Sequence, residues 1–250
     1  MSKNVLIVGA TSGIGRRLAE LYAESGCRVG IIGRREHLLN ETQQKSPTNI
    51  HIKKADITNE NINQSLNELI NEMNGVDVIV ISASIVEFNE GLLAEHEIKT
   101  IETNIKGFAR VMNFAWHYFR EKDGGQIVAI TSIAAARGNK SVPAYNASKA
   151  FQSHYTEGLR LKAEHEKNKI IITELIPGYV NTDMGRGDRI FWVSSVDKAA
   201  RLSKKAIDKK KKRAFIPKRW WWVYHILKLL PSFIHDPIIN SSWKQKRKTN

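Results

Sequence analysis

The strongest constraint on the fold is a regular alternation of short, continuous apolar runs with longer amphipathic stretches. The runs are rich in β-branched residues and lie at 5–8, 29–32, 77–81, 127–131 and 170–176. Their apolar character is continuous rather than alternating, which is typical of strands buried on both faces of a parallel sheet.

The stretches between these runs carry apolar residues at helical spacing, at 13–25, 98–119 and 144–166. Alternation of strands and helices at this length predicts an α/β fold. We expect a doubly wound, Rossmann-type parallel sheet of about seven strands with helices on both faces, its last strand near 214–216. The predicted domain covers residues 1–217, and a C-terminal amphipathic extension covers 218–250.

The charge of the 250-residue chain is unevenly distributed. The net charge is +14, yet residues 1–200 hold 24 Lys/Arg against 23 Asp/Glu, whereas residues 201–250 hold 15 against 2. The single cysteine, Cys27, excludes a disulfide framework and a cysteine-based metal site, and no metal site is predicted. One cysteine also favours a reducing, cytoplasmic compartment.

A glycine-rich segment, GATSGIG, follows the first predicted strand and leads into a helix. Glycines permit a tight turn and close approach of a ligand, and the start of the helix offers free N–H groups to a phosphate. The segment therefore predicts a dinucleotide site formed by Gly9, Thr11, Ser12, Gly13, Ile14 and Gly15.

The second predicted strand ends in IIGRRE. A site that prefers NAD usually has an acid here, which binds the ribose hydroxyls. Arg34 and Arg35 instead have guanidinium groups suited to a 2′-phosphate, so NADP(H) is the predicted cofactor. The alternative is a solvated pair of charges at the start of a helix.

The segment YNASK places Tyr145 and Lys149 one helical turn apart on the same face. A free tyrosine has a pKa near 10, and a neighbouring ammonium favours the phenolate and lowers that pKa. The pair is either an ordinary surface couple or a device for proton transfer, and its setting decides between them.

Taken together and in this order, the motifs resemble the short-chain dehydrogenase/reductase family over roughly residues 3–217. They are GATSGIG, KADIT with Asp56, TNIKG with Asn104, ITSIA with Ser132, YNASK and PGYVNT. The resemblance implies a catalytic set of Asn104, Ser132, Tyr145 and Lys149. Ser132 would bind the substrate oxygen, Lys149 the nicotinamide ribose, and Asn104 a water that relays protons to Lys149.

The same resemblance implies the remaining cofactor contacts. Asp56 and Ile57 would lie beside the adenine, while Tyr145 and Lys149 would also touch the cofactor. The nicotinamide would be bordered by Pro177, Gly178, Val180 and Thr182. A homodimer or tetramer is implied as well, with the homodimer formed through the helices that carry Asn104 and Tyr145. One departure from the family is Ser82–Ile85, which stands where the family has Asn-Asn-Ala-Gly.

The substrate side is expected to be apolar. Its candidate residues are Met184, Ile190, Phe191 and Trp192 together with Ile133, Val142 and Tyr179, although the aromatic ones could equally pack a lid onto the body. The predicted function is an NADPH-dependent oxidoreductase acting on the carbonyl or hydroxyl group of an apolar, possibly lipid-like substrate. The alternative is a non-catalytic NADP(H)-binding redox sensor that retains the fold.

The extension contains the apolar stretch Trp220–Leu230. As a helix it is about 16 Å long, against a hydrocarbon core of about 30 Å, so it should not cross a bilayer. Basic clusters at 209–213, 218–219 and 244–248 favour in-plane attachment to an anionic membrane, on the inner face. Packing on the body or on a second subunit is the main alternative. Nucleic acid is disfavoured because the aromatic residues lie together.

Overall fold

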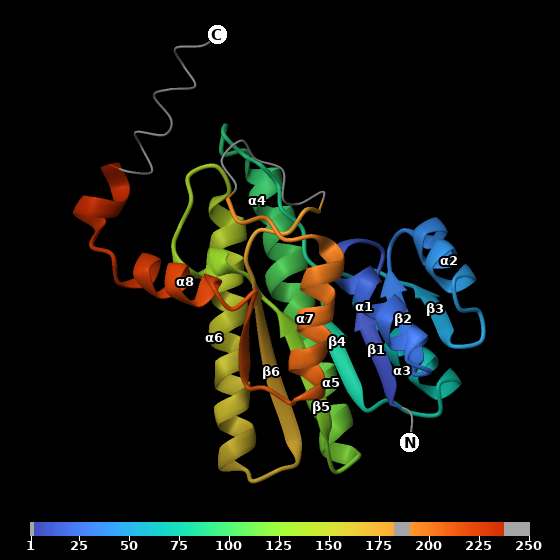
Figure 1. Cartoon of the computed structure of the whole chain (residues 1–250). Helices are drawn as coiled ribbons and strands as arrows, with labels where there is room; N and C mark the ends of the chain where they lie inside the picture. The colour runs from blue at the N-terminus through green and yellow to red at the C-terminus, as the bar shows by residue number, and fades with distance from the viewer. Residues whose placement is uncertain (1–2, 183–190, 238–250) are drawn as a thin grey trace.

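The computed structural model describes residues 3–182 and 191–237 and has one parallel sheet of seven strands (Figure 1). The strand order is β3-β2-β1-β4-β5-β6-β7, and in the centre Val5 pairs with Val29 on one side and Val78 on the other. The strands are β1 (Asn4–Val8), β2 (Arg28–Gly33), β3 (Ile50–Lys54), β4 (Val78–Ile81), β5 (Gly125–Ile130), β6 (Ile170–Pro177) and β7 (Arg213–Ile216).

All the predicted apolar runs form strands, and the predicted last strand is β7. β3 was not among the predicted runs. It lies at the edge of the sheet, where only Ile50 is fully buried and Lys54 is exposed. An edge strand with a half-solvated face lacks the continuous apolar run that marks the central strands.

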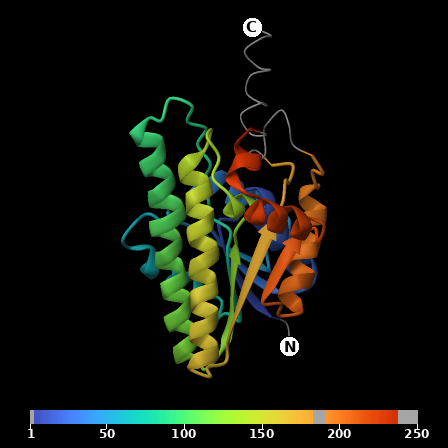
Figure 2. The same ribbon diagram turned by 90° about the vertical axis from the view of Figure 1, so that its left-hand side faces the viewer.

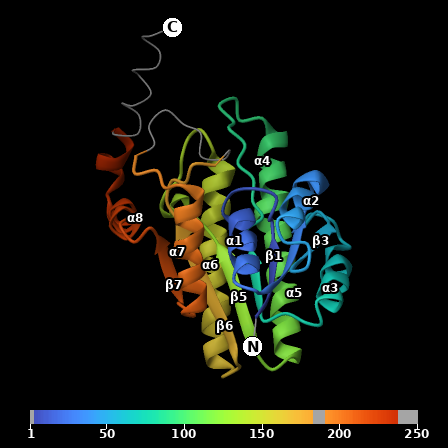
Figure 3. The ribbon, with the colours of Figure 1, turned by 45° about the vertical axis from the view of Figure 1, so that its right-hand side comes forward.

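Helices cover both faces of the sheet, which confirms the doubly wound fold. One face carries α1 (Gly13–Glu24), α2 (Glu36–Gln44) and α7 (Val196–Asp208), with α1 and α7 side by side in front of the sheet in Figure 3. The other carries α3 (Ile62–Glu72), α5 (Phe108–Glu121) and α6 (Pro143–His165), and α4 (Ala94–Ile101) packs on α6.

The stretch predicted as one helix at 98–119 is interrupted. A π-helix, η1 (Glu102–Gly107), joins α4 to α5 and contains the buried Asn104. Such wide turns redirect side chains and main-chain carbonyls relative to a regular helix, and they are frequent at functional sites.

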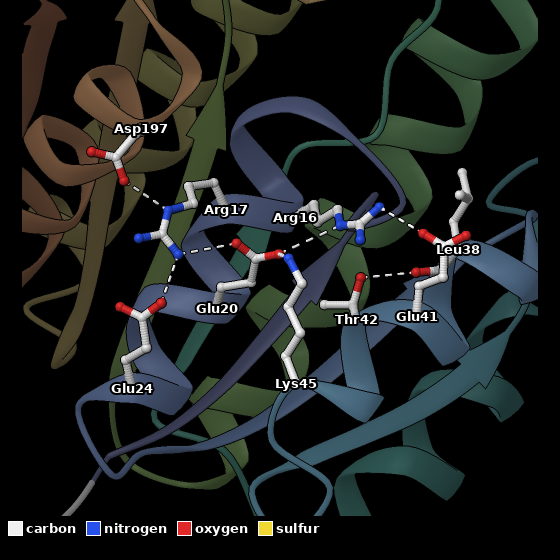
Figure 4. A network of polar contacts seen from close by, with 9 residues as sticks. All are labelled: Arg16, Arg17, Glu20, Glu24, Leu38, Glu41, Thr42, Lys45 and Asp197. Atoms are coloured by element: carbon white, nitrogen blue, oxygen red, sulfur yellow. Dashed lines mark hydrogen bonds and ion pairs between the residues drawn. The ribbon is translucent and has the colours of Figure 1, made fainter.

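A network of ion pairs fixes α1 against its neighbours (Figure 4). Arg17 bonds Asp197 on α7 at 2.8 Å and Glu20 at 3.0 Å, and Glu20 is also paired with Lys45 beyond α2. Burial by itself would raise the pKa of Glu20, but the hydrogen bonds from Lys45 and Arg17 outweigh it and the net shift is downward. The network therefore holds in place the helix whose first turn contains the end of the glycine-rich segment.

The first part of the C-terminal extension packs on the body. α8 (Trp220–Leu229) lies across the carboxyl ends of β6 and β7 (Figure 2). Trp220 and Tyr224 are buried in a cluster with Phe215 and Ile176, although both follow the expected boundary at 217. A Cβ at Gly178 would lie 2.0 Å from the Trp220 indole, so the ring packs flush on the backbone there. None of the described helices is both long and apolar enough to span a membrane.

We predict that Trp220→Ala destabilises the protein by about 3–5 kcal/mol, because a wholly buried indole is removed next to a glycine that cannot fill the space. Trp222→Ala is the matched control: its side chain is 67% exposed and the change should stay within about 0.5 kcal/mol. Chemical denaturation measures both. Equal midpoints for the two variants would show that α8 is not anchored through Trp220.

Candidate active site

A cavity of about 620 Å³ opens at the carboxyl ends of the central strands, between β1 and β4, where the order in which strands are added to the sheet reverses. Clefts at such switch points are the usual ligand sites of open α/β sheets. The cavity is lined by every predicted cofactor-binding and catalytic residue except Gly15 and Asn104. The fold thus brings together residues that are far apart in the sequence.

The glycine-rich segment requires its glycines. Gly9 has φ +93°, and a Cβ there would lie 2.3 Å from the backbone nitrogen of Ala83. A Cβ at Gly15 would lie 2.3 Å from the Gly9 oxygen, so Gly15 supports the turn from behind the cavity. Ser12 precedes α1 without capping it by its side chain, so the first N–H groups of the helix are left for a ligand.

The two arginines after β2 lie at the same end of the cavity. Arg35 donates to the Thr11 hydroxyl at 2.7 Å and to the Ser12 hydroxyl at 2.9 Å, which ties the glycine-rich segment to the end of β2. Arg34 is half-exposed and its Nη1 lies 3.6 Å from Asp56 Oδ2. A guanidinium held this loosely at a cavity wall is free to turn toward a bound anion.

Ser132, Tyr145 and Lys149 line the cavity together. Ser132 follows β5 and starts a short 3-10 helix, η2 (Ile133–Ala136), where its Oγ accepts from Ala134 N at 3.1 Å. Tyr145 and Lys149 come from the first turns of α6, with the Lys149 Nζ 5.7 Å from the centre of the Tyr145 ring. The four-residue spacing in YNASK therefore places Tyr145 and Lys149 on the same side of the helix, as its spacing predicts.

The electrostatics differ from the sequence prediction. Burial is the largest influence on the pKa of Tyr145 and raises it, against a hydrogen bond with Ser132 that lowers it. Burial also lowers the pKa of Lys149 to about 7. The expectation that Lys149 lowers the pKa of Tyr145 is thus not met by the groups of the chain alone, because desolvation opposes the charge on both side chains.

Asn104 lies next to the cavity rather than in its wall. Its side chain binds the backbone of Ile85 twice, at 2.8 Å each, and donates to Ser148 Oγ at 3.0 Å. These bonds fix the 82–85 segment that departs from the family sequence. The Asn104 main-chain oxygen accepts from Gln152 Nε2 at 2.8 Å. The water relay through Asn104 stays a prediction, and an amide side chain links Asn104 to Lys149 in this structure.

Several site residues were missed by sequence reasoning. Gln152 bonds Lys149, and Asn146 donates to the main-chain oxygens of Ala134 and Arg137, tying η2 to α6. The cavity wall also includes Arg137, Leu227 and His235. Only Asn146 gave a signal, since it follows Tyr145 in YNASK; the others depend on contacts between segments distant in sequence.

The aromatic residues near the substrate side were expected either to line the cavity or to pack a lid onto the body, and the structure shows packing for Phe191 and Trp192. Ile133, Val142 and Tyr179 line the cavity as predicted, but Phe191 and Trp192 do not. Phe191 packs 5.2 Å from the Trp220 ring and 5.5 Å from Trp192, so these aromatics hold the segment after 190 against α8. Met184 and Ile190 lie outside the described residues.

The cavity fits a dinucleotide. Its walls combine a tight glycine turn at Gly9, packed on the Ser82–Ala83 backbone, an uncapped helix start and two guanidinium groups. Ser84 adds a buried hydroxyl oxygen that faces no hydrogen-bond partner within residues 3–182 and 191–237. Over the same described ranges, no cluster of three or more His, Cys, Asp or Glu residues could hold a metal ion.

The family model described as short chain dehydrogenase matches residues 3–190. The chain belongs to the short-chain dehydrogenase/reductase family and is an oxidoreductase of that family. It is 29% identical over 231 residues to an uncharacterized oxidoreductase of Mycobacterium tuberculosis, covering 88% of this chain and 89% of the relative.

Solved structures agree with this membership. An actinorhodin polyketide ketoreductase with NADPH is 28% identical, with a TM-score of 0.68 over 74% of this chain and 73% of the other. A short chain dehydrogenase/reductase from Burkholderia phymatum in complex with NAD is 18% identical, with a TM-score of 0.79 over 90% and 92%. The second likeness supports the fold alone.

Proposed function

We propose that the protein is an NADPH-dependent oxidoreductase that transfers hydride between the cofactor and the carbonyl or hydroxyl group of a small apolar substrate. The observation that carries the proposal is one continuous cavity. Ser132, Tyr145 and Lys149 lie in its wall together with the glycine-rich segment and the two arginines.

Arg34 and Arg35 support the choice of NADP(H) over NAD(H). No acid follows β2 directly, and Asp56, the carboxylate nearby, is within reach of Arg34. Known complexes of similar fold include one with NADPH and one with NAD, so the fold alone leaves the preference between the two cofactors open, and the two arginines support NADP(H).

The nicotinamide, when bound, supplies or accepts the hydride. Tyr145 supplies or takes the proton at the substrate oxygen, and the Ser132 hydroxyl hydrogen-bonds that oxygen and stabilises its developing charge. Because burial raises the pKa of Tyr145, the phenol keeps its proton at neutral pH. A protonated phenol is the form that donates a proton to a carbonyl oxygen, so Tyr145 at neutral pH is in the form that acts as the acid in carbonyl reduction.

The substrate end of the cavity supports an apolar compound. Ile133 and Val142 contribute aliphatic surface, Tyr179 an aromatic ring, and Leu227 from α8 completes the wall. Arg137 donates to the main-chain oxygens of Leu227, at 2.9 Å, and Leu230, so its charge is used in holding α8 in place. His235, on the helical segment 232–237 that follows α8, adds a polar group to the cavity wall.

The outer face of α8, which we define as Trp222, Ile226 and Leu229, supports peripheral attachment of a cytoplasmic protein to an anionic membrane. Spaced at 4 and 3 residues on one helix, these side chains share one side, and Leu229 is 80% exposed. Lys218, Arg219 and Lys228 are also exposed. The cluster 209–213 lies at the start of β7, at the opposite end of that strand from α8, and 244–248 lies outside the described residues.

The homodimer or tetramer stays a prediction. The apolar side chains of Ile98 and Ile101 on α4 and Leu161 on α6 are exposed and support it. These residues lie on the helices that the family resemblance implies for self-association, whereas the outer face of α8 is a separate surface.

Tyr145→Phe should lower kcat for apolar ketones by about 10²–10⁴-fold, since the ring remains and the proton donor is lost. NADPH affinity, followed by cofactor fluorescence, should change little. The matched control is Tyr155→Phe, on the same helix but outside the cavity wall. A wild-type protein that binds NADPH yet turns over no ketone in a broad panel would instead support the redox sensor.

Arg34→Glu should raise KM for NADPH at least about tenfold, since a charge-assisted hydrogen bond to the 2′-phosphate is worth about 1.5–3 kcal/mol. KM for NADH should change far less, and steady-state kinetics with both cofactors measures the ratio. Lys54→Glu, an equal charge change on the exposed end of β3, controls for the general field. An unchanged ratio would remove Arg34 from the cofactor site.

The full-length protein should sediment with vesicles of phosphatidylglycerol and phosphatidylcholine at low salt, and much less with phosphatidylcholine alone. Replacing both Trp222 and Leu229 by Ser should lower the partition coefficient at least about tenfold, because two large side chains lose their apolar contact. Leu161→Ser removes an equally exposed leucine from α6 and serves as the control. Protein that stays in the supernatant with anionic vesicles contradicts the attachment.

A further inference from the structure

Gln152 connects the Lys149 ammonium to the main chain of the neighbouring π-helix. Its Oε1 accepts from Lys149 Nζ at 2.9 Å, and its Nε2 donates to the main-chain oxygen of Asn104 at 2.8 Å. Lys149, Gln152 and Asn104 are all almost wholly buried, so these bonds form away from bulk water. The residue follows Lys149 by three positions on α6, on the same side of the helix.

Chemistry allows one orientation of this amide. An ammonium has hydrogens to donate and no lone pair, and a main-chain carbonyl can only accept. The carboxamide oxygen must therefore face Lys149, and the NH2 group must face Asn104. Thr156 adds a bond from its hydroxyl to the Gln152 main-chain oxygen at 2.6 Å, one turn farther along α6.

We propose that Gln152 is a positioning residue of the active site: its amide holds the Lys149 ammonium in place and stabilises the charged form through a fixed bridge to Asn104. The inference rests on the proposed function for its catalytic meaning. The bridge itself depends only on groups of this chain.

The surroundings of Lys149 make this bridge consequential. Its other acceptor is the Ile130 main-chain oxygen, at 3.4 Å, and no ion pair reaches Lys149 among the residues that the structure describes. Four titratable groups on α6 and the elements around it are engaged or neutral. They are Tyr145 on α6, Tyr179 after β6, Glu97 on α4, which accepts from Ala144 N, and Glu174 on β6, which is paired with Arg213.

Burial already lowers the pKa of Lys149 to about 7. Loss of the shorter of its two hydrogen bonds would lower it further, because the ammonium would face an apolar wall. A lysine that is neutral at pH 7 cannot favour the Tyr145 phenolate. Gln152 would thereby influence the ionisation of the phenol without touching the substrate or the cofactor.

The test is an NMR titration of the full-length protein labelled with ¹³C at lysine Cε, without added cofactor. The Lys149 signal is assigned by its loss in Lys149→Met, and its wild-type midpoint is expected near the pKa of about 7. Gln152→Leu keeps the approximate side-chain volume and removes the acceptor, so the midpoint should fall by about one pH unit. Gln152→Glu places a carboxylate at the ammonium, so the midpoint should rise by at least about one unit.

Ser153→Ala is the control for general perturbation of α6, since Ser153 is buried beside Gln152 and bonds Arg213 instead. It should leave the midpoint within about 0.3 units of wild type, well below the standard deviation of about one unit among protein pKa values. An unmoved midpoint in a folded Leu or Glu variant, or a shift of equal size in Ser153→Ala, overturns the proposal. If the Leu variant does not fold, the Glu variant alone decides.

The titration needs neither substrate nor NADPH, so it separates this inference from the proposed function. Opposite shifts in the Leu and Glu variants would stand even if no ketone were reduced. Conversely, turnover could depend on Tyr145 while the Lys149 midpoint stays the same in the Gln152 variants. The proposed enzyme activity would then stand, and the proposed role of Gln152 would be wrong.

Discussion

The buried ammonium of Lys149 is the group around which the rest of the site is arranged. Taking a charge out of water costs several kcal/mol unless hydrogen bonds replace the lost solvation. The structure supplies those bonds from neutral groups, the Ile130 carbonyl and the Gln152 amide, and pairs Lys149 with no acid among the described residues. A carboxylate partner would cancel the positive charge of Lys149. Neutral acceptors leave that charge available to Tyr145 and to a bound ribose.

Satisfying one ammonium in this way requires three elements to meet. β5 ends at Ile130 and leads directly into Ser132, α6 presents Tyr145, Lys149 and Gln152 on one side, and the π-helix turns the Asn104 carbonyl toward Gln152. The bond from Asn146 to the Ala134 main-chain oxygen and the bond from the Asn104 amide to Ser148 Oγ tighten the same junction. The proposed reacting groups therefore lie on rigid elements joined through buried polar bonds, whereas Arg34, which we propose to bind the cofactor phosphate, lies half-exposed at the cavity edge.

The sequence predicted most of this because the relevant patterns are local. Strands buried on both faces have continuous apolar runs, and Tyr145 and Lys149 share a helix, so their spacing alone sets their geometry. β3 was missed because its outer half is solvated. Gln152 could not have been singled out, since a glutamine on an amphipathic helix is ordinary and its role arises from packing against η1. Likewise, Trp220 looked like one of several tail tryptophans until β6 and β7 placed Gly178 beneath it.

α8 shows how one short helix can carry two surfaces. Trp220 and Tyr224 face the body, Leu227 reaches the cavity, and Ile226 and Leu229 point outward, so residues adjacent in sequence serve opposite sides. Arg137 binds the end of α8 through main-chain oxygens of the helix. The side chains of α8 therefore remain free to contact the body, the cavity and the outside. Because α8 is both a wall of the cavity and the support of the exposed apolar face, any surface that binds this face lies within a helix diameter of the substrate end. Under the proposed function, this position would let an apolar substrate pass from such a surface to Leu227 with little exposure to water.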